Sequence, residues 1–323
     1  MGAYPMAHFE FEPTVYYTTF GWHEPCLTVE PGDSIRVSTI DARGGDHRGK
    51  TVSERGNPQS GPFAVNGAEP GDMLTVTLDR VRATRDWGFS SSRLAPNALE
   101  FGDVPSFVDD ADRSFWSIDR EAGTIKLRAP ETASSGDRAP ARNRLRDLQL
   151  PFRPMLGCVA VAPPGRQHIS TATSGPFGGN MDYNGVVEGV TLCFPVFAPG
   201  ALFHLGDGHA LQGDGEMDGT GVEVSMDVTF TLGLVKGKTI AWPRIENSMH
   251  VMTVGNLRPL DQAVQHATSE MVRWLETDYG LTTREAHMLL GRMVEYDLGN
   301  MYDPAYTMIC KLRKDVLGAI LFS

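Results

Sequence analysis

The sequence has few cysteines, and they are widely spaced. Cys26, Cys158, Cys193 and Cys310 are the four cysteines of 323 residues, and no two of them form a Cys-x-x-Cys pair. This spacing is poor for a structural zinc site, and a chain of this length does not need a disulfide framework. We therefore expect four reduced cysteines that act as packing residues, with Cys193 in the core.

Long apolar runs and an excess of basic residues are also missing. No run approaches the 18 apolar residues of a membrane-spanning helix, and the first residues lack the basic and apolar parts of a signal peptide. The net charge is −11, which argues against a nucleic-acid or anionic-membrane partner because both require a basic surface. We expect a cytoplasmic globular protein, and the charge is compatible with a neutral small molecule as substrate.

Several catalytic and nucleotide-binding motifs are absent. The sequence has no Gly-x-Gly-x-x-Gly after a strand, no Gly-x-x-x-x-Gly-Lys-Ser/Thr, no Gly-x-Ser-x-Gly and no His-Glu-x-x-His. None of the cysteines lies in a loop suited to a nucleophile. If the protein is a hydrolase, it is expected to use a metal-activated water rather than a side-chain nucleophile.

Alternating apolar residues dominate the first 260 positions. Thirty-five glycines and 21 prolines divide this part into short segments. Period-two alternation with β-branched residues predicts strands with one buried face at 34–41, 73–81, 124–128 and 222–232. The last of these has the most regular alternation, with an apolar residue at every even position.

The segment Glu-Pro-Gly-Asp occurs twice, at 30–33 and at 69–72, each time before a predicted strand. Proline followed by glycine suits a type II turn. We interpret the two copies as equivalent turns of a β-sandwich. The alternative is that both carboxylates reach a functional site.

The pattern changes near residue 258. Residues 130–143 are polar and rich in helix and strand breakers, which predicts a long exposed loop. Helical spacing covers 259–276, a capping box at 282–285 opens a second helix that runs to 293, and a last strand covers 306–312. The predicted fold is mainly β, sandwich-like or barrel-like, with a small α+β C-terminal portion. Its predicted parts are 1–130, 131–257 and 258–323.

The densest group of reactive side chains lies between His204 and residue 216. Asp207 and His209 are two residues apart, as are Asp214 and Glu216, so in extended backbone each pair projects to one face. Imidazole with carboxylates is a plausible ligand set for zinc or a similar divalent ion. The alternative is a glycine-rich hairpin whose acidic residues only satisfy turn amides.

Two further segments carry candidate residues. Asn180 and Asp182 lie in Gly178-Gly-Asn-Met-Asp, where they could bind a hard cation or position a polar ligand. Asp41 ends a predicted strand and is followed by a loop that contains Asp46-His47-Arg48. Such loops hold site residues about as often as they are merely solvated.

These segments resemble the acetamidase/formamidase family. The resemblance rests on residues 197–216, on Gly178-Gly-Asn-Met-Asp182 and on residues 61–72, and it runs from about Tyr17 to Leu312. It implies hydrolysis of the C–N bond of a small linear amide to a carboxylate and ammonia. It also implies a β-rich fold with an α+β C-terminal part, a homo-oligomer (dimer or higher) and dependence on a divalent metal, with zinc the first choice.

The resemblance carries specific residues over to the site. Asp41 corresponds to the acidic residue at the end of the early strand, Asn180 and Asp182 to the glycine-rich loop, and Asp207, His209 and Glu216 to the segment that follows. Two stretches depart from the pattern, at Ser174-Gly-Pro-Phe and at the residues after Asp41. Both changes would alter a substrate pocket.

We therefore predict that Asp41, His209 and a further carboxylate, Asp207 or Asp214, hold the metal. Glu216 would transfer the proton, Asn180 would donate to the tetrahedral oxyanion, and Asp182 would belong to the same catalytic group. Two alternatives stay open. The protein could be a non-catalytic β-sandwich binding module with a structural calcium. It could instead be a diverged relative that acts on a substituted or cyclic amide. In the metal-dependent enzyme, calcium could be present as a second, structural ion.

Overall fold

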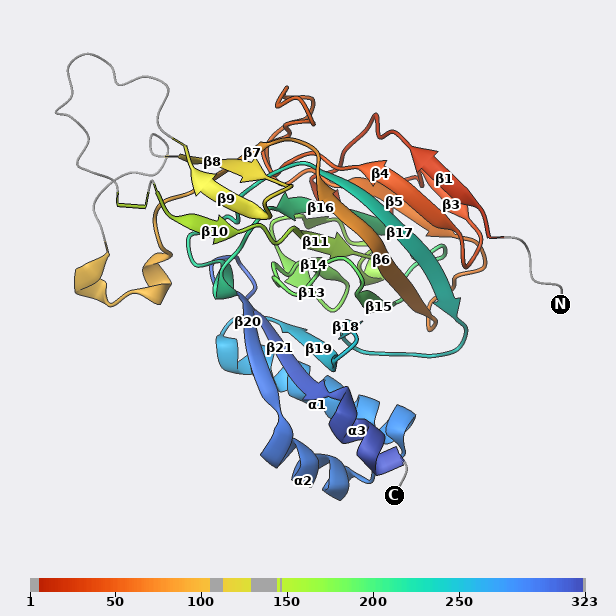
Figure 1. Ribbon diagram of the computed structural model, residues 1–323. Helices are drawn as coiled ribbons and strands as arrows, with labels where there is room; N and C mark the ends of the chain where they lie inside the picture. Colours follow the sequence, from red (N-terminus) through yellow and green to blue (C-terminus); the bar gives the residue numbers. More distant parts are fainter. Residues whose placement is uncertain (1–5, 105–112, 129–143, 146, 322–323) are drawn as a thin grey trace, which may run out of the picture.

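A nine-stranded sheet runs through the whole molecule in the computed structural model, which describes residues 6–104, 113–128, 144–145 and 147–321 (Figure 1). The two strands at one edge, which are given first in the order below, pair in parallel, and all other neighbouring pairs of this sheet are antiparallel. In spatial order the strands are β1 (His8–Phe11), β4 (Ser34–Ser38), β17 (Met226–Val235), β6 (Met73–Ala83), β15 (Thr191–Pro195), β18 (Arg244–Glu246), β19 (His250–Asn256), β21 (Thr307–Arg313) and β20 (Glu295–Asn300).

A six-stranded sheet packs against one end of the large sheet. Its strands, in spatial order, are β13 (Ser174–Gly175), β14 (Gly178–Asn180), β11 (Met155–Ala160), β16 (Phe203–His209), β5 (Ser60–Val65) and β3 (Leu27–Val29). Phe230 of β17 lies 5.4 Å, between ring centroids, from both Phe63 and Phe203 of the smaller sheet. The alternation along β17 produces this contact, because every second side chain faces the interior between the sheets.

Smaller elements complete the β part. A four-stranded sheet contains β10 (Gln149–Pro151), β9 (Thr124–Leu127), β8 (Ser114–Asp119) and β7 (Trp87–Ser90), and β12 (Ile169–Ser170) pairs with β2 (Thr19–Phe20). Short 3-10 turns are η1 (Pro96–Ala98), η2 (Phe101–Asp103), η4 (Pro164–Arg166) and η5 (Asp214–Glu216).

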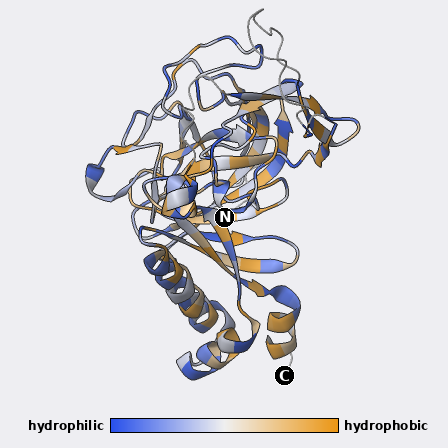
Figure 2. Cartoon of the chain, turned by 90° about the vertical axis from the view of Figure 1, so that its left-hand side faces the viewer, coloured by the Kyte–Doolittle hydropathy of each residue, from blue (hydrophilic) through white to orange (hydrophobic). Residues whose placement is uncertain are grey.

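Three helices lie in the C-terminal portion: α1 (Leu260–Tyr279), α2 (Thr283–Met293) and α3 (Lys314–Leu321). α1 packs the apolar side chains of Ala267, Met271 and Trp274 against the strands β19 and β21. Because only this face is buried, bands of hydrophobic and hydrophilic residues follow one another along the helix (Figure 2). α2 begins with the predicted capping box, in which Thr282 and Glu285 exchange hydrogen bonds. No helix in the described residues is long and apolar enough to cross a membrane.

The predicted fold class is confirmed: strands dominate, and the helices are concentrated near the C-terminus. The predicted strand at 222–232 is shifted, because residues 222–225 precede β17 and only Glu223 among them forms isolated bridges. The predicted loop at 130–143 lies outside the described residues. The three predicted parts of the chain all contribute strands to the nine-stranded sheet, and their separation into domains stays a prediction.

The cysteines are free, as expected. Cys158, Cys193 and Cys310 are buried, whereas Cys26 is exposed and is not a packing residue.

Candidate metal centre

A buried imidazole lies at the centre of the candidate site. His209 closes β16 and is fully buried. Its Nε2 atom is 3.0 Å from Glu223 Oε1, 3.4 Å from Asp207 Oδ1 and 3.9 Å from Glu216 Oε1. Its Nδ1 atom is 2.9 Å from Gln212 Oε1. One ring nitrogen therefore faces three carboxylates, and the other faces an amide.

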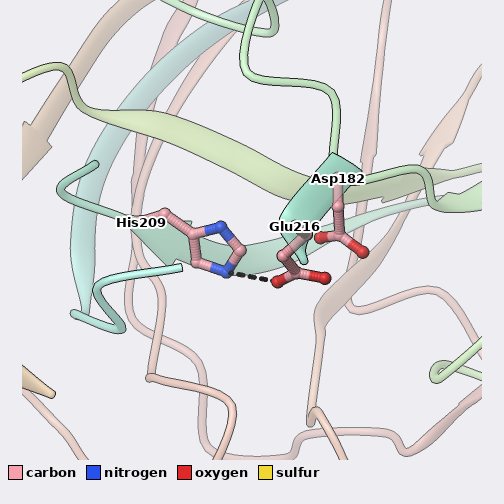
Figure 3. Close-up of side chains that lie close together, drawn as sticks. All are labelled: Asp182, His209 and Glu216. Carbon is pink, nitrogen blue, oxygen red and sulfur yellow. Dashed lines mark ion pairs between the residues drawn. The ribbon is translucent and has the colours of Figure 1, made fainter. Parts of the chain in front are cut away.

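The carboxylates come from different parts of the fold. Asp207 lies on β16, Asp182 follows β14, Glu216 ends η5, and Glu223 bridges His209 and Phe89 just before β17. Figure 3 shows Glu216 reaching the imidazole, with the Asp182 carboxylate beside it. All four carboxylates are buried. Pairing of distant segments therefore builds the site, and no single loop contains it.

Strained backbone supports this arrangement. Asp182, Asp207 and Glu216 have φ values of 43°, 57° and 45°, and Asn57, which contacts Asp207, has 57°. The left-handed region disfavours residues that carry a Cβ atom, at a cost of order 1–3 kcal/mol each. These four are among seven such non-glycine residues in the described part of the chain. The strain is concentrated where it aims carboxylates at the imidazole.

Three buried atoms in the cluster have no hydrogen-bond partner among the described residues: Asp182 Oδ1, His209 Nε2 and Glu223 Oε2. Buried polar atoms without a partner are costly. The ligand atoms form two overlapping groups, Asp182–His209–Glu216 and Asp207–His209–Glu223, each within 4.8 Å. A divalent cation would satisfy these atoms, and one imidazole nitrogen with carboxylate oxygens is a donor set that zinc accepts.

The electrostatics of the cluster also favour a cation. Burial raises the pKa values of Asp182 and Glu216 well above the usual range and raises that of Glu223 to about 7. Burial alone would lower the pKa of His209, but Glu223 and Asp207 outweigh it and raise the pKa well above its usual value. Without a cation, protons must therefore neutralise part of the negative charge.

Three asparagine amides hold the carboxylates in place. Asn57 Nδ2 donates to Asp207 Oδ2 (3.0 Å) and to Asn180 Oδ1 (2.7 Å). Asn180 Nδ2 donates to Asp182 Oδ2 (2.7 Å). Asn300, at the end of β20, donates to both Asp182 Oδ2 (2.8 Å) and Glu216 Oε2 (2.9 Å). In Asp207 and Glu216, one carboxylate oxygen accepts from an asparagine amide, and the other oxygen faces His209.

A further carboxylate, Asp303, lies at the edge of this network. It accepts a hydrogen bond from Asn180 Nδ2 (2.5 Å), and burial raises its pKa to about 6. The loop that carries it is held by Arg258, which donates to the backbone oxygens of Tyr302 and Asp303.

The structure brings together five of the seven predicted site residues and leaves two apart. The Asp41 carboxylate is taken up by the buried Arg85 guanidinium, at 2.7 Å, and by the backbone amides of Arg43 and Gly45. Asp214 is exposed and accepts a hydrogen bond from Asn184. The expectation that Asp214 and Glu216 share a face fails because the backbone there forms the 3-10 turn η5 rather than a strand. Neither Asp41 nor Asp214 belongs to the two candidate ligand groups.

Five residues of the site were missed in the sequence: Asn57, Gln212, Glu223, Asn300 and Asp303. Gln212 lies inside the segment between His204 and Glu216 and follows His209 by three residues in the sequence. This short spacing is a signal that could have identified it. Glu223 alternates with Val222 and Val224, and such a position ordinarily faces solvent. No local pattern marks Asn300 or Asp303, which reach the site by way of β20.

Comparison with known proteins identifies the family. The model of the acetamidase/formamidase family matches residues 18–166 and 158–310. A formamidase of Methylophilus methylotrophus is 26% identical over 259 residues, which cover 67% of this chain and 63% of that protein. An acetamidase of Mycolicibacterium smegmatis is 26% identical over 270 residues, with 67% of this chain and 65% of that protein covered. The chain thus spans slightly less than two thirds of the length of these curated relatives.

Solved structures share the fold over nearly the whole chain. A predicted acetamidase/formamidase of Thermoanaerobacter tengcongensis has a TM-score of 0.82 at 26% identity, with 98% of this chain and 99% of that chain covered. An acetamidase of Yersinia enterocolitica has a TM-score of 0.80 at 30% identity, with 98% and 94% covered. A gamma lactamase of Delftia acidovorans shares the fold alone, with a TM-score of 0.56 at 20% identity over 92% and 88% of the two chains. The chain belongs to the acetamidase/formamidase family.

Proposed function

We propose that the protein is a zinc-dependent amidase that hydrolyses a small linear amide, such as acetamide or formamide, to a carboxylate and ammonia. The observation that carries the proposal is the buried His209 Nε2 atom, which has no hydrogen-bond partner and faces the carboxylates of Asp207 and Glu223. Glu223 Oε2 lacks a partner as well. The names of the relatives, formamidase and acetamidase, supply the substrate class.

His209, Asp207 and Glu223 would hold the ion, because Nε2 lies within 3.4 Å of an oxygen of each carboxylate. When bound, zinc lowers the pKa of water to about 7 and polarises the amide carbonyl. Glu216 and Asp182 remain beside this group, with the Nε2 atom 3.9 Å from Glu216 Oε1.

Glu216 is our choice for the proton-transfer residue. Its pKa is raised by burial, so the carboxyl group can accept a proton from the attacking water and release it to the departing nitrogen. Asn300 donates to Oε2 and leaves Oε1 directed toward His209. An amide needs this proton because its nitrogen is otherwise a poor leaving group.

We propose a part for Asn180 other than the oxyanion donor. Its Nδ2 atom donates to Asp182 and Asp303, so its amide hydrogens are committed to carboxylates and not directed at an oxyanion. We propose that it orients Asp182. We also propose that the enzyme works in the cytoplasm as a homo-oligomer. The net charge of −11 favours the further proposal that it has no nucleic-acid or membrane partner.

Ammonia release over a panel of amides tests the function. The panel contains formamide, acetamide, propionamide and one lactam, and each is offered to enzyme that is untreated, stripped with chelator, or reloaded with zinc or calcium. We expect release from the linear amides, loss on stripping and recovery with zinc. Lactam hydrolysis opens the ring without freeing ammonia, so it is followed by the appearance of the amino-acid product. Hydrolysis of the lactam alone would support the cyclic-amide alternative. A calcium effect confined to thermal stability would support the binding module, and either result would overturn the proposal.

Asp207→Asn and Asp214→Asn form a matched pair for this assay. Both replace an aspartate of the same segment, but only Asp207 lies beside the imidazole, whereas Asp214 is exposed. We expect Asp207→Asn to lose most of the ammonia release and Asp214→Asn to keep it. Equal activity in the two variants would count against the proposed ligand set.

A further inference from the structure

Gln212 contacts the site from outside the ligand groups. It lies three residues after His209, between β16 and η5, and is 7% exposed. Its Nε2 atom donates to the backbone oxygens of Asp182 (2.5 Å) and Gly299 (3.3 Å). Its Oε1 atom is 2.9 Å from His209 Nδ1. One side chain thus touches three segments that build the cluster.

These contacts fix which way the amide of Gln212 points. Both backbone partners are carbonyl oxygens, which can only accept, so the amide nitrogen must face them. The amide oxygen then faces the imidazole, and because it too can only accept, His209 Nδ1 must carry the hydrogen of this contact. The lone pair available to a cation is therefore on Nε2, which is the atom directed toward Glu223 and Asp207.

Backbone also packs against the ring, near Cγ and Nδ1. A Cβ atom added at Gly221 would lie 2.3 Å from His209 Cγ, so the chain passes directly against the imidazole. Packing at Gly221 restricts the plane of the ring, and the Gln212 amide determines which nitrogen points to the carboxylates.

We propose that Gln212 is the positioning residue of the metal centre: it holds His209 with Nδ1–H donating and Nε2 turned to the cation. Through Asp182 and Gly299 it also ties the imidazole to β14 and β20. The proposal rests on the proposed function only for the presence of a metal ion, because the orientation of the ring follows from the contacts. Hydrogen-bond partners of ligating histidines typically contribute about 10- to 100-fold to metal affinity.

Two variants and a control test this role. Gln212→Met removes the acceptor at similar length, Gln212→Glu keeps an acceptor for Nδ1–H, and Gln265→Met places the same change on the exposed face of α1. Zinc affinity is measured by competition with a chromophoric chelator. The ring N–H resonances of histidine-labelled enzyme are recorded with and without zinc, and the His209 signal is assigned by its loss in His209→Gln.

For the wild type we expect a downfield, slowly exchanging Nδ1–H resonance. Gln212→Met should lose that resonance and bind zinc about 10- to 100-fold more weakly, whereas Gln212→Glu should keep the resonance and recover most of the affinity. The control should match the wild type. The proposal is wrong if Gln212→Met keeps both the resonance and the affinity, or if Gln212→Met and Gln212→Glu lose affinity equally with the resonance unchanged. Ammonia release by the wild type decides the proposed function separately, because the ring resonance does not depend on turnover.

Discussion

Gly157 of β11 shows how closely the site is packed at the scale of one residue. A Cβ atom added there would lie 2.3 Å from Asp182 Oδ1, 2.9 Å from Asp207 Oδ2 and 3.1 Å from His209 Cε1. The two distances to carboxylate oxygens are shorter than real Cβ contacts, so a methyl group must displace the carboxylates from the imidazole. We expect Gly157→Ala to weaken zinc binding and ammonia release by about tenfold or more, since ligand displacements of this size disturb both binding and catalysis.

Chelator competition and the ammonia assay measure this effect, with Gly213→Ala as the control. Gly213 lies in the same segment as Glu216, has φ of −78° and has no atom within 4 Å of an added Cβ. We expect the control to behave as the wild type. If Gly157→Ala also bound zinc normally, the cluster could not be as tightly arranged as the structure has it.

Sequence reasoning at this scale found the residue types but not all of the geometry. Asp207, His209 and Glu216 were found because they are dense in one glycine-rich segment. Asp214 was included for the same reason, although a 3-10 turn sends its side chain to solvent. Glu223 was missed because alternation assigns it to a solvated face, and only the pairing of its segment with β16 and Phe89 buries it.

At the scale of elements, the two Glu-Pro-Gly-Asp turns are structural. In each, the aspartate accepts a hydrogen bond from the backbone amide of the glutamate, Asp33 from Glu30 and Asp72 from Glu69. This confirms the interpretation as equivalent turns. The second turn has an additional partner, because Lys236 Nζ lies 2.6 Å from the Asp72 carboxylate.

Asp72 makes the stability of this turn depend on pH. The hydrogen bonds from Lys236 and from the Gly237 amide lower its pKa to about 2, whereas an unfolded aspartate has a pKa near 3.9. A depressed folded pKa gives stability that is complete above the unfolded value and is lost as the pH falls toward the folded one. We expect Asp72→Asn to be less stable than the wild type at pH 6, and the difference to shrink between about pH 4 and pH 2.

Urea unfolding at several pH values, with chelator present so that metal loss does not contribute, measures this difference. Asp103→Asn, at an exposed carboxylate that ends η2, serves as the control and should follow the wild type. A difference that stayed constant down to pH 2 would show that the Asp72 charge does not stabilise the turn.

The elements with strong local signals were predicted well. β6, β17, α1 and α2 follow from period-two or helical spacing, and the capping box placed the start of α2 at the correct residue. β20 was missed because its first residues are exposed and its apolar residues do not alternate regularly. Its place beside β21 depends on pairing with another strand, which a local pattern does not contain.

On the scale of the whole molecule, the C-terminal portion belongs to the site as well as to the fold. Asn300 ends β20, Asp303 follows it in the chain, and Met301 N donates to Gly215 O in η5. β20 is thus both an edge strand of the nine-stranded sheet and the element that brings the C-terminal portion to the candidate metal centre. This link could not be predicted, because it requires the registers of several long-range strand pairs at once.

The same connection predicts how zinc affects the whole molecule. A ligand that binds only the folded state stabilises it by about 2.7 kcal/mol when its concentration is 100 times its Kd. The residues of the centre come from β16, η5 and β20, from β14 and the residues after it, and from the bridge at Glu223. Zinc should therefore slow hydrogen exchange in all of these segments together, at 178–182, 203–216, 222–225 and 295–303. α2, which precedes β20 in the chain and lies at the lower end of the C-terminal portion in Figure 1, has no residue in the cluster. It serves as the internal control and should change little. Exchange measured by mass spectrometry with and without zinc tests this. Protection confined to 203–216 would mean that the ion is held by that segment alone, and that the C-terminal portion only packs beside the site.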